Sequence, residues 1–262
     1  MKKYITINKE YHQIRRIIKK ETLKIFRKNL KFIGGQEKYL VDYIYRGQEF
    51  GLTPRNWDEF VVLINLFNDS LQNSHLSKEL LLIGQYSAAG NIIRTIIENA
   101  VLVKYLVINA EKWKEWLEYT FLQERYRIEP LQKKNPRLRI LGTVFSTTNM
   151  IQNCIEPNKI KSYKRKYLFL CSFTHASMDR FRRISTLSRI QLKIHYSPQF
   201  NNELCEGLFN DIFVMIDSLF SSFDKTIKLR KTPTSLKKYL KLRDEFYRDY
   251  DPDAKLIISP RK

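Results

Sequence analysis

A mostly apolar stretch of the chain carries an arginine and a glutamate four residues apart, Arg94 and Glu98. Residues at i and i+4 share one face of an α-helix, and Ser87 and Asn91 extend the same polar strip. Charged groups in apolar surroundings are costly unless they are paired or solvated in a cleft. The pattern therefore has two interpretations, a structural ion pair that joins two helices or the lining of a functional cleft.

A second group of residues surrounds a histidine. In a helix, Ser172, His175 and Asp179 would lie at i−3, i and i+4 on one face. A carboxylate in that position can hold the imidazole and set its tautomer, and histidine can move protons near neutral pH. A histidine with purely structural hydrogen bonds fits the same pattern, so both interpretations are kept.

Basic and aromatic residues flank this histidine on both sides. Cations contact phosphates, and aromatic faces stack on the bases of single-stranded nucleic acid. A solvated charged face would look similar, but almost no carboxylates offset this one. We expect the nucleic-acid-binding side chains to be Lys164, Arg165, Lys166, Arg180, Arg182 and Arg183, with Tyr163, Tyr167 and Phe181 interleaved among them.

Arg189 and His195 form an alternative catalytic pair. Five residues separate them, which is the arginine-to-histidine spacing found in HEPN ribonucleases. A chain rich in arginine produces this spacing by chance, and Ile190 stands where a polar residue commonly follows the arginine.

The run from Tyr86 to Glu98, with its small residues followed by R-x-x-x-E, resembles the DUF5677-like family of bacterial helical proteins when it is taken with the later Ser172-x-x-His175. The resemblance covers roughly residues 78–180. It implies an all-helical fold related to HEPN-like bundles, several of which are toxins or antiviral effectors, and it implies no known reaction. It also implies a site made of Arg94, Glu98, Ser172 and His175, and HEPN-like proteins commonly complete such sites across a homodimer.

The leading functional hypothesis is an RNA-directed protein, in particular a metal-independent ribonuclease that acts as a toxin or in antiviral defence. His175, or else His195, would move the proton of the 2′-hydroxyl or of the leaving oxygen. Arg94 would stabilise charge on the phosphate, and Glu98 would orient Arg94. RNA is the expected nucleic acid rather than DNA, and an antitoxin or another defence protein is an expected partner.

Two other functions are compatible with the sequence. One is a non-catalytic nucleic-acid-binding or protein–protein adaptor module, in which Arg94 and Glu98 are a structural pair. The other is attachment to an anionic membrane through the basic N-terminal segment, in which apolar and charged residues are too interspersed for this to be preferred.

No metal site or cofactor is expected. The three cysteines, Cys154, Cys171 and Cys205, are far apart and form no C-x-x-C pair, and the four histidines include no H-E-x-x-H spacing. The basic start of the chain is followed by charged residues instead of an apolar segment, so we expect no secretory signal and a cytoplasmic location.

Composition and spacing predict an all-α, single-domain helical bundle. Glycine and proline number 8 each among 262 residues, few for a turn-rich β fold, and no run alternates clearly enough to be a sheet. The formal net charge is +20, and residues 1–32 hold eleven basic residues against two acidic ones. The expected domains are a basic helical arm (1–35), a helical core (36–232), and a short helix with a flexible tail (233–262).

Within this bundle, breaker residues predict where the helices begin and end. Gly34-Gly35 should end the first helix, and a helix from Asn56 should end at Asn73-Ser74. One long helix should cover 77–110, with another helix crossing closely over its small residues near Gly90. Further helices should follow Pro136, Pro157 and Pro198, over about 158–187 and 201–229 for the last two, with a short helix in the tail.

Overall fold

The computed structural model describes residues 2–50, 52–126, 135–174, 185–187, 192–194, 200–229 and 231–250. Most of these residues lie in ten α-helices, which confirms the all-α prediction. In chain order these helices are α1 (Lys2–Ile25), α2 (Arg27–Tyr45), α3 (Trp57–Leu82), α4 (Tyr86–Ile108), α5 (Lys112–Arg125), α7 (Pro136–Val144), α8 (Thr147–Cys154), α9 (Pro157–Thr174), α11 (Asn202–Phe223) and α12 (Thr234–Tyr250). Two short 3-10 helices are η1 (Gly47–Phe50) and η2 (Asp224–Thr226).

Local capping residues start several of these helices where the sequence predicts. The Asn56 side chain accepts backbone N–H bonds of 3.0 and 3.3 Å from the first turn of α3, which also holds Asp58 and Glu59. Asn135 caps α7 in the same way, with Pro136 as the first helical residue. These side chains satisfy N–H groups that have no partner within the helix.

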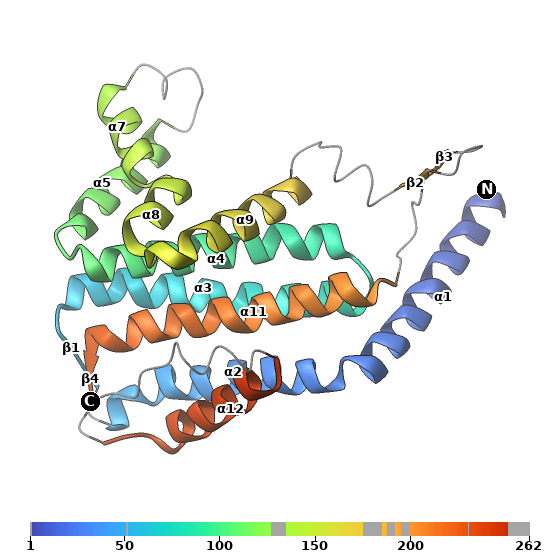
Figure 1. The fold of residues 1–262 in the computed structure, drawn as a ribbon, viewed down its shortest axis with the longest axis horizontal. Helices are drawn as coiled ribbons and strands as arrows, with labels where there is room; N and C mark the ends of the chain where they lie inside the picture. The colour runs from blue at the N-terminus through green and yellow to red at the C-terminus, as the bar shows by residue number, and fades with distance from the viewer. Residues whose placement is uncertain are drawn as a thin grey trace.

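Three long helices, α3, α4 and α11, run side by side through the centre of the molecule (Figure 1). The central helix α4 also packs against α8 and α9, while α12 packs on α2 and α2 on α11. Helices α5, α7 and α8 gather at one end of the bundle, and α1 projects at the other (Figure 1). α4 is therefore the framework on which α9 and its surface are held.

Aromatic rings join these layers. Phe67 of α3 stacks on Phe223 of α11 at 5.2 Å between ring centroids, and Phe213 of α11 stacks on Phe246 of α12 at 3.9 Å. All four side chains are buried. Such rings contribute large buried apolar areas, which drive the packing of the bundle.

A carboxylate lies inside this core. Asp217 of α11 accepts hydrogen bonds from the hydroxyls of Tyr239, at 2.5 Å, and Tyr247, at 2.9 Å, both on α12. Burial raises the pKa of Asp217, although the tyrosine donors and nearby Arg243 act in the opposite direction. The two hydroxyls supply the hydrogen bonds that a buried carboxylate needs.

The described residues include only two very small antiparallel pairs of strands. β1 (Thr53–Pro54) pairs with β4 (Ile227–Lys228), and β2 (Ser185–Leu187) pairs with β3 (Leu192–Ile194). The predicted helices over 158–187 and 201–229 are therefore wrong at their C-terminal ends, where β2 and β4 lie.

The prediction that Gly34 and Gly35 end the first helix is wrong, because α2 runs through both. The first break comes at Phe26, between α1 and α2. A Cβ on Gly35 would lie 2.8 Å from Cδ2 of Leu242 on α12. The small residue here allows close packing between helices and does not end one.

The predicted helix end at Asn73-Ser74 is also wrong. Ser74 is fully buried, and its hydroxyl donates a 3.0 Å hydrogen bond to Glu37 of α2. The predicted continuous helix over 77–110 is instead divided between α3 and α4. Gly84 lies at the division with φ of 73°, in the left-handed region that favours glycine.

The predicted domain boundaries at 35 and 232 stay predictions. The first falls within α2, where Phe32, Ile33, Gln36 and Leu40 are all buried. No described helix combines the length and apolar character that crossing a bilayer requires.

Candidate nucleic-acid interface

Helix α9 has one face toward the core and one toward solvent. Tyr163 and Tyr167 pack against the core, and Leu170 and Phe173 are buried. The spacing of three or four residues places these side chains on one side of the helix. Lys161, Lys164 and Arg165 are consequently carried on the other side.

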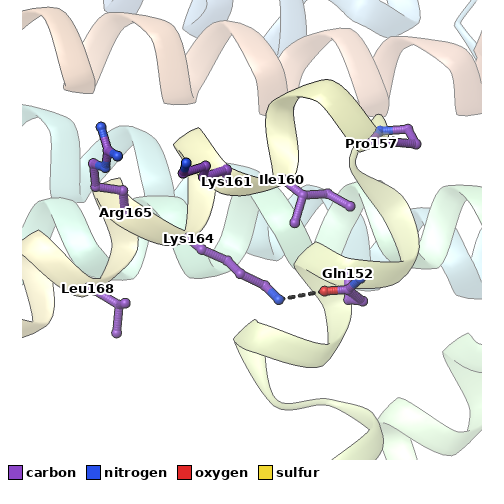
Figure 2. Close-up of a pocket in the computed structure, with 7 residues that line it drawn as sticks. All are labelled: Gln152, Pro157, Ile160, Lys161, Lys164, Arg165 and Leu168. Atoms are coloured by element: carbon purple, nitrogen blue, oxygen red, sulfur yellow. Dashed lines mark hydrogen bonds between the residues drawn. The ribbon is translucent and has the colours of Figure 1, made fainter.

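An open depression of about 640 Å³ lies over the solvent side of α9. Figure 2 shows Lys164 of α9 reaching to Gln152 of α8, with a hydrogen bond of 2.5 Å between Nζ and Oε1. Lys161 and Arg165 are exposed on the same helix. None of the lining residues is acidic; they are Gln152, Pro157, Ile160, Lys161, Lys164, Arg165 and Leu168. We call this depression the α9 groove.

The three cations of the α9 groove keep their charge available. Lys164 bonds to a neutral amide, and no described carboxylate forms an ion pair with Lys161 or Arg165. Other lysines of α9 are neutralised, because Lys159 pairs with Glu156 at 2.6 Å and Lys166 pairs with Asp211 of α11. The groove is therefore a local concentration of positive charge.

The structure separates the predicted nucleic-acid-binding residues. Lys164 and Arg165 line the α9 groove, whereas Lys166 is turned to Asp211. Burial raises the pKa of Asp211 above its ordinary value, although Lys166 acts in the opposite direction. Arg180, Arg182 and Arg183, together with Phe181, lie outside the described residues. Tyr163 and Tyr167 do not line the groove.

The i,i+4 pair predicted from sequence is formed. Nε of Arg94 donates a 3.0 Å hydrogen bond to Oε1 of Glu98, and the two side chains are 26% and 28% exposed. The hydroxyl of Tyr167 donates to the same Oε1 at 3.1 Å. Desolvation raises the pKa of Tyr167 to about 12, so the phenol is the donor at neutral pH. The pair thus links α4 to α9.

Tyr167 is the residue of this cluster whose role the sequence did not reveal. It lies 69 residues from Glu98, and its spacing on α9 indicates only an inward-facing aromatic. The polar partner of the pair follows from how α4 and α9 cross, which no local pattern encodes.

The predicted close crossing near Gly90 is confirmed. A Cβ on Gly90 would lie 2.5 Å from Cδ2 of Phe173, inside normal carbon contact distance. α9 can approach α4 this closely because residue 90 has no side chain, and the approach sets the positions of Tyr167 and the α9 groove.

The histidines of the two catalytic hypotheses lie outside the described residues, as does Arg189. Ser172, three residues before His175 in the sequence, donates a 2.6 Å hydrogen bond from its hydroxyl to the carbonyl of Phe169 one turn earlier. His195 directly follows β3 in the sequence. The catalytic roles of His175, Arg189 and His195 stay predictions.

No protein-family model, curated protein or solved structure matches this chain. The resemblance to the DUF5677-like family stays a prediction. Fold and surface together define an all-α protein with an open cationic groove on one of its peripheral helices.

Proposed function

We propose that this protein binds single-stranded RNA, with the α9 groove as the site that contacts the sugar–phosphate backbone. The observation that carries the proposal is the presence of Lys161, Lys164 and Arg165 in one open depression without a carboxylate. Lysine and arginine contacts to phosphates supply most of the sequence-independent affinity for nucleic acids.

The shape of the groove supports a flexible strand. It is open along the helix and has aliphatic walls at Ile160 and Leu168, the latter 64% exposed. A single strand can follow a positively charged groove with its phosphates at the cations, and the apolar walls give its bases a surface to contact. The amide of Gln152 on α8 bonds to Lys164 of α9. It offers a hydrogen-bonding group for a 2′-hydroxyl, the group that distinguishes RNA from DNA.

Arg94 and Glu98 act structurally in this proposal. Arg94 pairs with Glu98, and Glu98 accepts the hydrogen bond from Tyr167 that joins α9 to α4. Neither Arg94 nor Glu98 lines the α9 groove. The proposal therefore corresponds to a non-catalytic binding protein, while RNA cleavage stays a separate prediction.

The test measures binding of a fluorescently labelled single-stranded RNA by anisotropy. The α9 variant carries Lys161→Gln, Lys164→Gln and Arg165→Gln. A control with the same change in charge carries Lys237→Gln, Lys238→Gln and Lys241→Gln, three exposed lysines of α12.

The α9 variant should bind RNA more weakly, and its affinity should depend less on salt. The logarithm of the binding constant falls as the logarithm of the salt concentration rises, and each phosphate contact on a single strand makes this slope steeper by about 0.7. The loss of three contacts makes the slope shallower by about 2.1. Between 50 and 200 mM salt, the wild-type protein should therefore lose about 20-fold more of its affinity than the α9 variant loses. Equal RNA affinity and equal salt dependence of the α9 and α12 variants would overturn the proposal.

A separate incubation tests the ribonuclease hypothesis. RNA is incubated with the wild-type protein in EDTA, beside His175→Ala and His195→Ala variants. Intact RNA with salt-sensitive binding supports the binding protein. Cleavage that one histidine substitution abolishes would establish the enzyme instead.

A further inference from the structure

Helix α1 carries a second basic surface, separate from the α9 groove. Its inward side is marked by the buried residues Ile18 and Thr22. Lys20 is two residues from each, and each residue turns the helix by about 100°, so Lys20 lies almost opposite them. Arg16 and Lys24, four residues to either side of Lys20, extend this outward side over about 12 Å of helix. We call Arg16, Lys20 and Lys24 the α1 basic face.

The charge of the α1 basic face is not neutralised by the described side chains. All three residues are exposed, and none has a described carboxylate within ion-pair distance. Neighbouring cations on the flanks do have partners: Lys19 lies 3.8 Å from Glu79, and the guanidinium of Arg15 lies over the ring of Tyr11. Among the described side chains, Arg16, Lys20 and Lys24 thus form a row of cations without a carboxylate partner, on a helix that projects from the bundle (Figure 1).

The arrangement of apolar residues on α1 distinguishes between two polyanionic partners. A helix that lies in a bilayer surface inserts a central apolar stripe and carries its cations beside it. On α1 the order is reversed. Lys20 is central, and the exposed Ile17 and Leu23 lie about 60° to either side of it. The side chains described on α1, from Tyr11 onward, form no apolar stripe on this side. A row of cations instead matches a row of phosphates.

We infer that the α1 basic face is a second binding surface for the nucleic-acid backbone, so that one strand is held at both α1 and the α9 groove. This inference rests on the proposed function, because it takes RNA to be the ligand of the groove. Two surfaces on one strand raise the affinity through effective concentration, with no additional contact at either surface.

The experiment compares three variants with matched loss of charge. The α1 variant carries Arg16→Gln, Lys20→Gln and Lys24→Gln, and the α9 and α12 variants are those described above. Glutamine keeps a helix propensity close to that of lysine and arginine, and circular dichroism checks that each variant is folded. Each protein binds the same labelled RNA, long enough to reach both surfaces, over a range of salt.

For the α1 variant, the slope of log K against log salt should be shallower than that of the wild type by about 2, as for the α9 variant. The α12 variant should have the wild-type slope. If the α1 variant matches the α12 variant while the α9 variant is weakened, the inference fails and the proposed function stands. If only the α1 variant is weakened, the α1 surface stands and the α9 groove is not the site. Equal weakening of all three overturns both, because bulk charge would then explain the binding.

A lipid partner is tested directly with vesicles of phosphatidylcholine and phosphatidylserine. We expect flotation with these vesicles to be the same for the wild-type and α1 variant proteins. Flotation that depends on the α1 basic face, together with unchanged RNA affinity of the α1 variant, would overturn the inference in favour of a membrane surface.

Discussion

The close crossing of α4 and α9 predicts opposite effects of the same substitution at two helical glycines. At Gly90, a Cβ would lie 2.5, 2.8 and 2.9 Å from three ring carbons of Phe173, a side chain that is 1% exposed. At Gly207, in the exposed part of α11, a Cβ would meet nothing within 4 Å. The two sites differ in packing but share helical backbone.

The magnitude of the difference follows from the one energetic term that the two sites do not share, the overpacking against Phe173 at Gly90. Glycine to alanine in a helix interior gains up to about 1 kcal/mol at either site. At Gly90 the ring of Phe173 must withdraw by about 1 Å to restore carbon contacts near 3.5 Å, and overpacking of this kind costs about 1–3 kcal/mol. Gly207→Ala should therefore be more stable than Gly90→Ala by about 1–3 kcal/mol, since the helix term cancels.

Urea denaturation followed by circular dichroism measures this difference. A double variant, Gly90→Ala with Phe173→Leu, provides the control. It should be more stable than the sum of the two single effects predicts, because removing the ring also removes the clash. Equal stabilisation by Gly90→Ala and Gly207→Ala would refute the close crossing of α4 and α9.

Three further predictions concern hydroxyl, thiol and carboxyl groups. Tyr167→Phe removes the hydrogen bond to the carboxylate on α4 and should lower the free energy of unfolding by about 1 kcal/mol; no loss in urea titrations would argue against the link between α4 and α9. Burial raises the pKa of Cys154 to about 11 and that of Cys205 to about 12, so a thiol reagent at pH 8 should label only Cys171 in the folded protein; labelling that persists in Cys171→Ser would contradict this. Burial raises the pKa of Asp217, so the folded state favours its protonated form, and stability from this group is lost as pH rises from below its ordinary value of 3.8 through the raised pKa. Asp217→Asn should gain stability relative to the wild type over that range, and a difference that stays constant from pH 4 to pH 7 in urea titrations would disprove the shift.

The sequence predicts features that depend on neighbouring residues. Asn56 and Asn135 cap helices because their side chains bond to N–H groups two or three residues away. The Arg94–Glu98 pair is equally local, since one turn of helix brings the two side chains together. In such cases residue type and spacing contain the required geometry.

Features that depend on distant segments were missed or misinterpreted. Gly35 is a typical helix-ending residue, but its role is to admit Leu242, more than 200 residues further along the chain. Ser74 looks like part of a loop until Glu37 of another helix supplies its hydrogen bond. The partners of the lysines in α9 follow the same rule. Lys164 and Lys166 are two residues apart in a basic run, and only the packing of α8 and α11 leaves the first lysine in the groove and pairs the second with Asp211.

Acetylation of lysines in the presence of RNA tests whether RNA binds at the α9 groove. The protein is treated briefly with an acetylating reagent, alone and with saturating single-stranded RNA, and modification at each lysine is measured by mass spectrometry. We expect RNA to slow modification of Lys161 and Lys164 and to leave modification of Lys237 and Lys238 of α12 unchanged. Bound RNA that leaves Lys161 and Lys164 as reactive as in the free protein would contradict this expectation.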